Sequence, residues 1–322
     1  MRTPSTESND KDGGTITEAT LNARIEHLVN YCSLKQTPQG DDMSMFIHHT
    51  LMMLEDAGMS IRYPAIRHIT LDEDGKSMER SFSSCMEGRR VSIEQNQHMK
   101  FLMLFTLLDF HVDATHPELE GKSYRQKYLK LPAQGDYHLI LRQLFRVAKV
   151  IRNALIHNQS SFAISEGHIS VDYCVRDQHF FLKISFEAFK DLHTAIVMYV
   201  KGDMGRESYF LGIMRSVYAS IQAGIMHFND DFGSALEQPT NGIKMNRHVR
   251  QVVLNPTYET CGDALFFPIA ARQIEKWEGM DLYFVRNDIE YLLPREALNE
   301  NLSIKEHDLI NSWKREGHYP QI

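Results

Sequence analysis

The feature that most constrains this chain is a helix-forming stretch at residues 139–158 with one apolar and one polar face. At about 100° per residue, the angle set by α-helical geometry, the apolar side chains gather on one side: Leu144, Val147, Ala148, Ile151, Ala154 and Leu155. The opposite side carries polar and basic residues: Arg142, Arg146, Lys149, Asn153 and His157. Such a helix needs other elements to cover its apolar face, so the pattern predicts a helical core around residues 137–158.

Helical periodicity also occurs elsewhere, and it predicts helices at residues 17–31, 43–57, 94–112, 187–200 and 207–228. Shorter periods predict strands within 60–93, a hairpin at 161–186, and strands at 249–254, 264–269 and 282–293. A capping box from Ser303 to Glu306 predicts that a last helix begins there and runs through Trp313. The expected fold is mainly α, a helical bundle flanked by small α/β regions.

Composition divides the chain into four regions. Residues 1–20 are polar and are expected to be a disordered tail, and residues 21–93 are expected to form an N-terminal α/β region. The helical domain, with a β-hairpin insertion, is expected at residues 94–230. A break between 229 and 242, rich in Asp, Ser, Pro, Asn and Gly, then leads to a small C-terminal α/β appendage at 240–322.

Several classes of protein are excluded by composition. No uninterrupted apolar stretch reaches the roughly eighteen residues that a membrane span needs, and the polar N-terminus lacks the apolar core of a signal peptide. A cytoplasmic protein without a membrane partner is therefore expected. The four cysteines are far apart and form no CxxC pair, which excludes a cysteine-built zinc ribbon and gives no sign of a disulfide framework.

The charge of the chain is distributed unevenly. The net charge is −7, yet the window 121–152 contains a single acid, Asp136, and eight basic residues: Lys122, Arg125, Lys127, Lys130, Arg142, Arg146, Lys149 and Arg152. A basic strip on an acidic protein can attract a polyanion to one place. Its other interpretation is an ordinary solvated helix face.

The end of the central helix carries residues suited to cleaving RNA without a metal. In that reaction the 2′-hydroxyl loses a proton, the 5′-oxygen gains one, and the charge on the phosphorane must be stabilised. His157 can act as base or acid near neutral pH, and the guanidinium of Arg152 matches phosphate oxygens in two-point geometry. Asn153 lies one turn before His157 on the same face and can orient it.

The segment Arg152-Asn153-Ala154-Leu155-Ile156-His157 resembles the signature of the HEPN superfamily, which consists of Arg, a polar residue that is often Asn, a short spacer, and His. The spacer of four residues lies at the lower end of that family's range. The resemblance covers residues 94–200, about a third of the chain. It implies a HEPN-type helical bundle.

The resemblance also implies a function. Active members of the superfamily are metal-independent endoribonucleases that work as dimers, with two signatures facing each other across a cleft. Applied to this sequence, the resemblance implies that Arg152 and His157 are catalytic and that Asn153 assists them. Neighbouring basic residues would hold the RNA backbone: Lys122, Arg125, Arg142, Arg146 and Lys149. A homodimer with no cofactor is expected, in a toxin–antitoxin or phage-defence setting, with an antitoxin or regulatory protein as a further partner.

Two alternatives remain open from the sequence. The chain is a catalytically silent HEPN module that dimerises or binds a partner, or it is a regulator whose basic strip captures a nucleotide. A metal site formed by Asp109, His111, Asp113 and His116 is not expected, because these residues lack a fixed ligand spacing. Asp109 is instead a candidate polar partner for Arg152 from the neighbouring helix.

Overall fold

The computed structural model describes residues 50–54, 65–71, 77–82, 97–157, 159–165, 167–202 and 207–315. The expected tail at residues 1–20 and the predicted helix at 17–31 lie outside these ranges. Of the helix predicted at 43–57, residues 50–54 are described, and they are helical.

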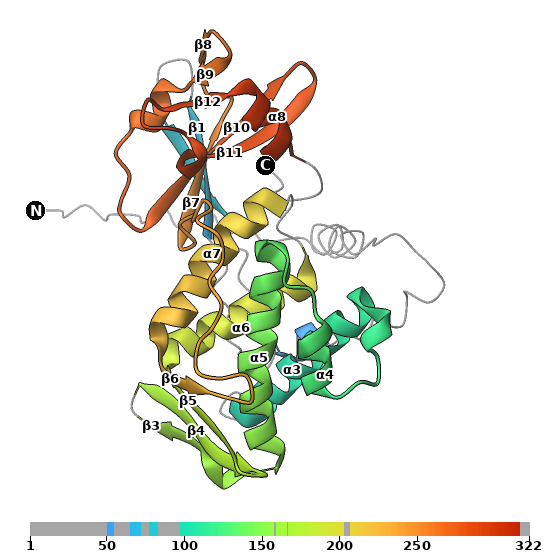
Figure 1. Cartoon of the computed structure of the whole chain (residues 1–322). Coiled ribbons are helices and arrows are strands. Elements are labelled where there is room, and N and C mark those ends of the chain that lie inside the picture. Colours follow the sequence, from blue (N-terminus) through green and yellow to red (C-terminus); the bar gives the residue numbers. More distant parts are fainter. Residues whose placement is uncertain are drawn as a thin grey trace, which may run out of the picture. The chain divides into compact units, whose positions relative to one another are not determined.

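Five helices form the centre of the described structure (Figure 1): α3 (Gln97–Thr115), α4 (Tyr124–Lys130), α5 (Gly135–His157), α6 (Phe186–Lys201) and α7 (Glu207–Gly224). Helix α5 packs against the four others, and its apolar face is fully buried, as with Leu144 and Ile151. Helix α6 begins where Ser185 caps the backbone N–H of Ala188, and it ends at Gly202, which has the left-handed conformation that glycine tolerates best. The predicted helical core is thus confirmed.

Beside α5 lies an antiparallel four-stranded sheet in the order β3-β4-β5-β6. Its strands are β3 (Phe162–Ser165), β4 (His168–Val175), β5 (Gln178–Ser185) and β6 (Ile225–Asn229). One face of the sheet is buried against α5 through side chains such as Val171 and Leu182, which are cross-strand partners. The hairpin predicted at 161–186 is confirmed. The helix predicted to reach residue 228 ends instead at Gly224, because β6 begins there.

The second sheet joins strands from the first and the second half of the chain. Its order is β11-β10-β7-β1-β2, formed by β1 (Ala65–Leu71), β2 (Ser77–Phe82), β7 (Val249–Leu254), β10 (Glu278–Arg286) and β11 (Ile289–Pro294). Strand β7 pairs in parallel with both β1 and β10. Strands from the expected N-terminal region and from the expected C-terminal appendage therefore share one sheet.

A third, small sheet has the order β12-β9-β8 and consists of β8 (Glu259–Cys261), β9 (Ala264–Phe266) and β12 (Ser303–Lys305). Helix α8 (Glu306–Ser312) follows β12 directly. The predicted capping box is wrong, because Ser303 lies in β12, where it pairs with Phe266, and α8 has no side-chain cap.

The expectation of a mainly α fold, a HEPN-type helical bundle with small appendages, is also wrong. The described residues contain sheets of five, three and four strands beside the helices. The chain is an α/β mixture. The strands of the five-stranded sheet are predicted one by one, but not their assembly into one sheet, because their partners come from distant parts of the chain, as in the pairing of Ala65 with Val249.

Candidate active site

The last two turns of α5 bring together the three residues of the signature. Five residues on a helix correspond to about 140° of rotation, so Arg152 and His157 do not share a face. The long Arg152 side chain nevertheless bends toward the helix end, and its Nη1 lies 3.3 Å from Nε2 of His157. Because an arginine can only donate, this contact uses the lone pair of Nε2, and the neutral ring then carries its proton on Nδ1. His157 is exposed and Arg152 is half-buried.

The aromatic ring of Tyr124, on α4, contacts the guanidinium of Arg152. The Cζ atom of Arg152 lies 4.8 Å from the centre of the Tyr124 ring, a cation–π contact. The tyrosine ring is held edge-on by Phe105 of α3, with the ring centres 5.1 Å apart, and it also contacts Phe145 of α5. Packing thus limits the positions that the Arg152 side chain can take.

Asn153 links the signature to the four-stranded sheet. Its Oδ1 accepts a hydrogen bond of 3.2 Å from Nη1 of Arg152. Burial raises the pKa of the Tyr173 hydroxyl on β4, although a hydrogen bond with the Asn153 side chain acts to lower it. The same hydroxyl donates to the backbone oxygen of Val150. Asn153 therefore orients Arg152 from a position fixed by the sheet.

Arg146, two turns earlier on α5, has a different environment. Its side chain is 2% exposed, and its guanidinium pairs with Asp230, whose side chain is fully buried. The Nη2–Oδ1 distance is 2.6 Å, and Nη1 and Nη2 also donate to the backbone oxygens of Ala235 and Gly233. Burial alone would lower the pKa of Arg146, but the hydrogen bonds to Asp230 raise it. Arg146 is therefore not part of an exposed RNA-binding surface.

Lys149 is buried in the same way, with its Nζ 2.5 Å from Oδ1 of Asp231. Arg125, on α4, approaches Asp231 from the solvent side with its side chain 63% exposed, at a distance of 3.1 Å. The expectation of an exposed basic face along α5 is wrong at Arg146 and Lys149. The segment 229–242, which the sequence marks as a break in composition, supplies the acids that cover these two side chains.

The remaining predicted RNA contacts lie at the rim of this segment. Arg142 stacks its guanidinium on Tyr128 at 4.5 Å and pairs with Glu237 at 3.5 Å, which leaves it partly exposed. Lys122 is exposed at the connection before α4. Of the five residues predicted to bind RNA, Lys122 and Arg125 are exposed, Arg142 partly so, and Arg146 and Lys149 are not.

Asp109 does not pair directly with Arg152. Its carboxylate accepts a hydrogen bond of 2.6 Å from Nζ of Lys127, which Asp113 also binds. Burial alone would lower the pKa of Lys127, but the hydrogen bonds to Asp109 and Asp113 raise it. The positive charge of Arg152 is still close enough to act on the pKa of Asp109. Among the described residues, no group of three His, Cys, Asp or Glu side chains could hold a metal ion.

Sequence reasoning missed Tyr124, Tyr173 and Asp230. Tyr124 follows Ser123, the first residue of a Ser-x-x-Gln capping box that marks the start of α4, so its place on a helix was detectable. The role of Asp230 was not, because it depends on a contact between residues 84 positions apart.

No family model, curated protein or solved structure matches this chain. In the part of the chain that the structure describes, none of the helices combines the length and the apolar character needed to cross a bilayer.

Proposed function

We propose that this protein is a metal-independent endoribonuclease whose active site is formed by Arg152, Asn153 and His157. One observation carries the proposal: the guanidinium and the imidazole meet at 3.3 Å at the exposed end of α5, within a single chain. The resemblance of this segment to the HEPN signature supports the same activity.

The chemistry follows from the atoms present. A phosphate that binds Arg152 draws the guanidinium away from His157, which frees the Nε2 lone pair to accept the proton of the ribose 2′-hydroxyl. The 2′-oxygen then bonds to phosphorus, and the bond from phosphorus to the 5′-oxygen breaks. Arg152 stabilises the charge that develops on the non-bridging oxygens. The products are a 2′,3′-cyclic phosphate and a 5′-hydroxyl.

The departing 5′-oxygen needs a proton from a second group. His157 takes one proton in this scheme, so a different acid must supply the other. A second copy of the chain, with its own His157 facing the first, would provide it. This homodimer is part of the proposal, and it agrees with the arrangement that the resemblance implies.

Cleavage of purified RNA tests the proposal directly. With EDTA present, the wild type should cut single-stranded RNA, and His157→Ala should reduce the rate by about 10²–10⁴-fold, the usual contribution of a general acid or base. His168→Ala, a histidine on β4 outside the proposed site, is the matched control and should retain activity. Chelator-resistant cleavage that persists without His157 would contradict the assignment.

A second candidate is a catalytically silent module that dimerises or binds a partner protein. The neutralisation of Arg146 and Lys149 by Asp230 and Asp231 favours it, because fewer cations remain to hold RNA. Overexpression in bacteria distinguishes the two functions. A nuclease of the toxin or phage-defence type should stop growth in a manner that depends on His157. A silent module should leave growth unchanged and form a stable complex that His157→Ala retains.

A further inference from the structure

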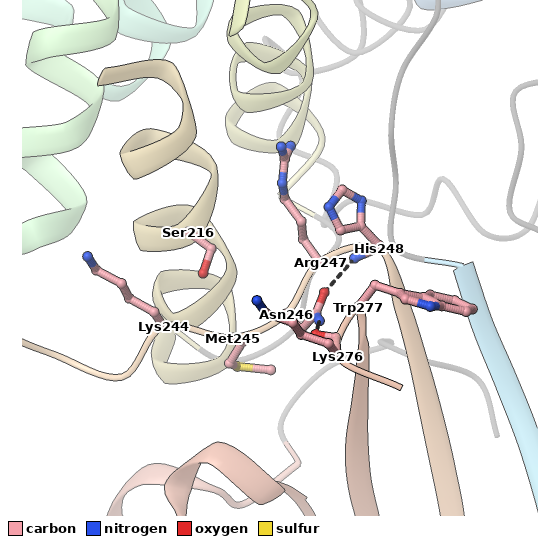
Figure 2. A pocket seen from close by; sticks show the side chains of 8 residues that line it. All are labelled: Ser216, Lys244, Met245, Asn246, Arg247, His248, Lys276 and Trp277. Atoms are coloured by element: carbon pink, nitrogen blue, oxygen red, sulfur yellow. Dashed lines mark hydrogen bonds between the residues drawn. The ribbon is translucent and has the colours of Figure 1, made fainter. Parts of the chain in front are cut away.

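A second candidate site lies far along the chain from Arg152 and His157. A cavity of about 500 Å³ opens between helix α7 and the two segments that lead into strands β7 and β10. Figure 2 shows its lining, which consists of Ser216, Lys244, Met245, Asn246, Arg247, His248, Lys276 and Trp277. Cavities of this size accommodate small organic ligands.

The lining is basic although the whole chain is acidic. It contains two lysines, an arginine and a histidine, and it includes no carboxylate among the described residues. The charge of Arg247 is already balanced, because its guanidinium forms two hydrogen bonds of 2.5 and 2.6 Å with Asp191 on α6. Lys244 and Lys276 are both exposed, and neither pairs with a carboxylate of the described residues. These two ammonium groups therefore favour an anionic ligand.

The cavity is held in shape by hydrogen bonds between its walls. The side chain of Asn246 donates to the backbone oxygen of Lys276 at 3.1 Å and accepts from the backbone N–H of His248 at 3.1 Å (Figure 2). Met245 is fully buried, and its backbone N–H donates to the oxygen of Gly212 on α7. A Cβ atom on Gly212 would lie 2.4 Å from the sulfur of Met245, so glycine allows this close approach. A wall fixed in this way reduces the entropy lost on binding a ligand.

Trp277 adds a flat aromatic surface to this charged lining. Its side chain is 45% exposed, whereas Trp313, the other tryptophan of the chain, is 5% exposed. An indole ring stacks on nucleobases with little dependence on their identity, and lysines bind phosphate as point charges. We propose that this cavity binds a mononucleotide, with its phosphate near Lys244 and Lys276 and its base against Trp277. This proposal is independent of the nuclease activity.

Titration of the full-length protein with three probes tests it. We expect AMP to bind in calorimetry with a Kd of about 1 mM or tighter and to quench the fluorescence of Trp277. Adenosine lacks the phosphate and inorganic phosphate lacks the base, so each should bind at least about tenfold more weakly than AMP. No binding of AMP, or equal binding of AMP and adenosine, would overturn the proposal.

Variants identify the residues responsible. Lys244→Glu combined with Lys276→Glu should weaken AMP binding by at least about tenfold, since two attractive contacts become repulsive. Lys305→Glu makes the same reversal of charge at one exposed lysine in β12 and should leave binding unchanged. Trp277→Leu should reduce the affinity for AMP about fivefold or more but not that for inorganic phosphate. AMP binding that survives the double lysine change would exclude this cavity as the site.

Discussion

The middle and the end of helix α5 carry the same kinds of side chain but differ in what surrounds them. In the middle, Arg146 is buried against Asp230, and each of the three nitrogens of its guanidinium donates to at least one oxygen. At the end, Arg152 pairs with no carboxylate of the described residues and instead reaches the exposed ring of His157. A buried arginine with a fixed carboxylate serves the fold, whereas one that contacts an aromatic ring and an imidazole remains available to a phosphate.

The difference arises from one neighbouring segment. Residues 229–242 lie along the middle of α5 and place Asp230, Asp231 and Glu237 opposite its cations. The described contacts of this segment end before the last turn of the helix. Cationic residues of one helix therefore do not share a function merely because they belong to the same basic strip.

The largest effect should follow from replacing Arg152 with lysine. Arg152→Lys keeps the charge but removes the two-point contact with phosphate, and the cleavage rate should fall by about 10²–10³-fold. Thermal unfolding should change little, because Arg152 is half-buried and makes no ion pair in the described structure. Equal cleavage by the variant and the wild type would remove the functional distinction between the two parts of α5.

Arg146→Met should lower the stability of the fold, and its effect is not on catalysis. It leaves the Asp230 carboxylate buried without its guanidinium, and the free energy of unfolding should fall by about 3–5 kcal/mol in urea titrations. The double variant Arg146→Met with Asp230→Leu removes both charges and should recover part of that loss. A single variant as stable as the wild type would show that the buried pair is not what holds the middle of α5.

A buried histidine adds a test that depends on pH. His193 on α6 is buried among Phe101 and Phe189, and its Nε2 has no partner among the described residues. Burial lowers its pKa from 6.5 to about 3. Between these values the unfolded chain binds a proton that the folded chain does not, so the stability contributed by the neutral ring is lost as the pH falls.

His193→Phe should therefore flatten the dependence of unfolding free energy on pH between about 6 and 4. The difference in slope from the wild type should approach about 1.4 kcal/mol per pH unit. Parallel pH profiles for the wild type and His193→Phe would contradict the assignment of His193 as a neutral core residue.

The smallest effect is expected for Arg125, at the exposed edge of the basic strip. Arg125→Ala removes an ion pair with Asp231 that is largely exposed on the arginine side, and the free energy of unfolding should change by about 1 kcal/mol or less. If Arg125 also contacts RNA, binding measured at low salt should weaken, and the difference should shrink as salt is added. A loss of stability as large as that of Arg146→Met would place Arg125 with the buried part of the strip.

Local pattern predicted those elements whose partners are near in sequence. Helix α5 was predicted at 137–158 and runs from Gly135 to His157, and the hairpin of β4 and β5 was predicted with its strands in place. Strand β7 was predicted with its exact bounds, but nothing in its sequence indicated that it pairs with β1 as well as β10. Pairing across such separations depends on tertiary contacts, which leave no periodic signal.

The candidate site was predictable to the same extent. The motif placed Arg152, Asn153 and His157 at one helix end, but helical geometry alone kept the arginine and the histidine on different faces. Their contact depends on the reach of one side chain and on the support of Tyr124. The burial of Arg146 and Lys149 could not be predicted, because a segment with the composition of a linker covers them.

The same covering segment has a consequence for biosynthesis. Asp230 emerges from the ribosome 84 positions after Arg146, its ion-pair partner in α5. Until then the growing chain contains a helix whose central cations have no counter-charge, beside apolar surface that is already exposed. The central helices can therefore reach their final packing only late in translation, and a nascent chain that stalls before this segment should be a preferred substrate for chaperones and proteases.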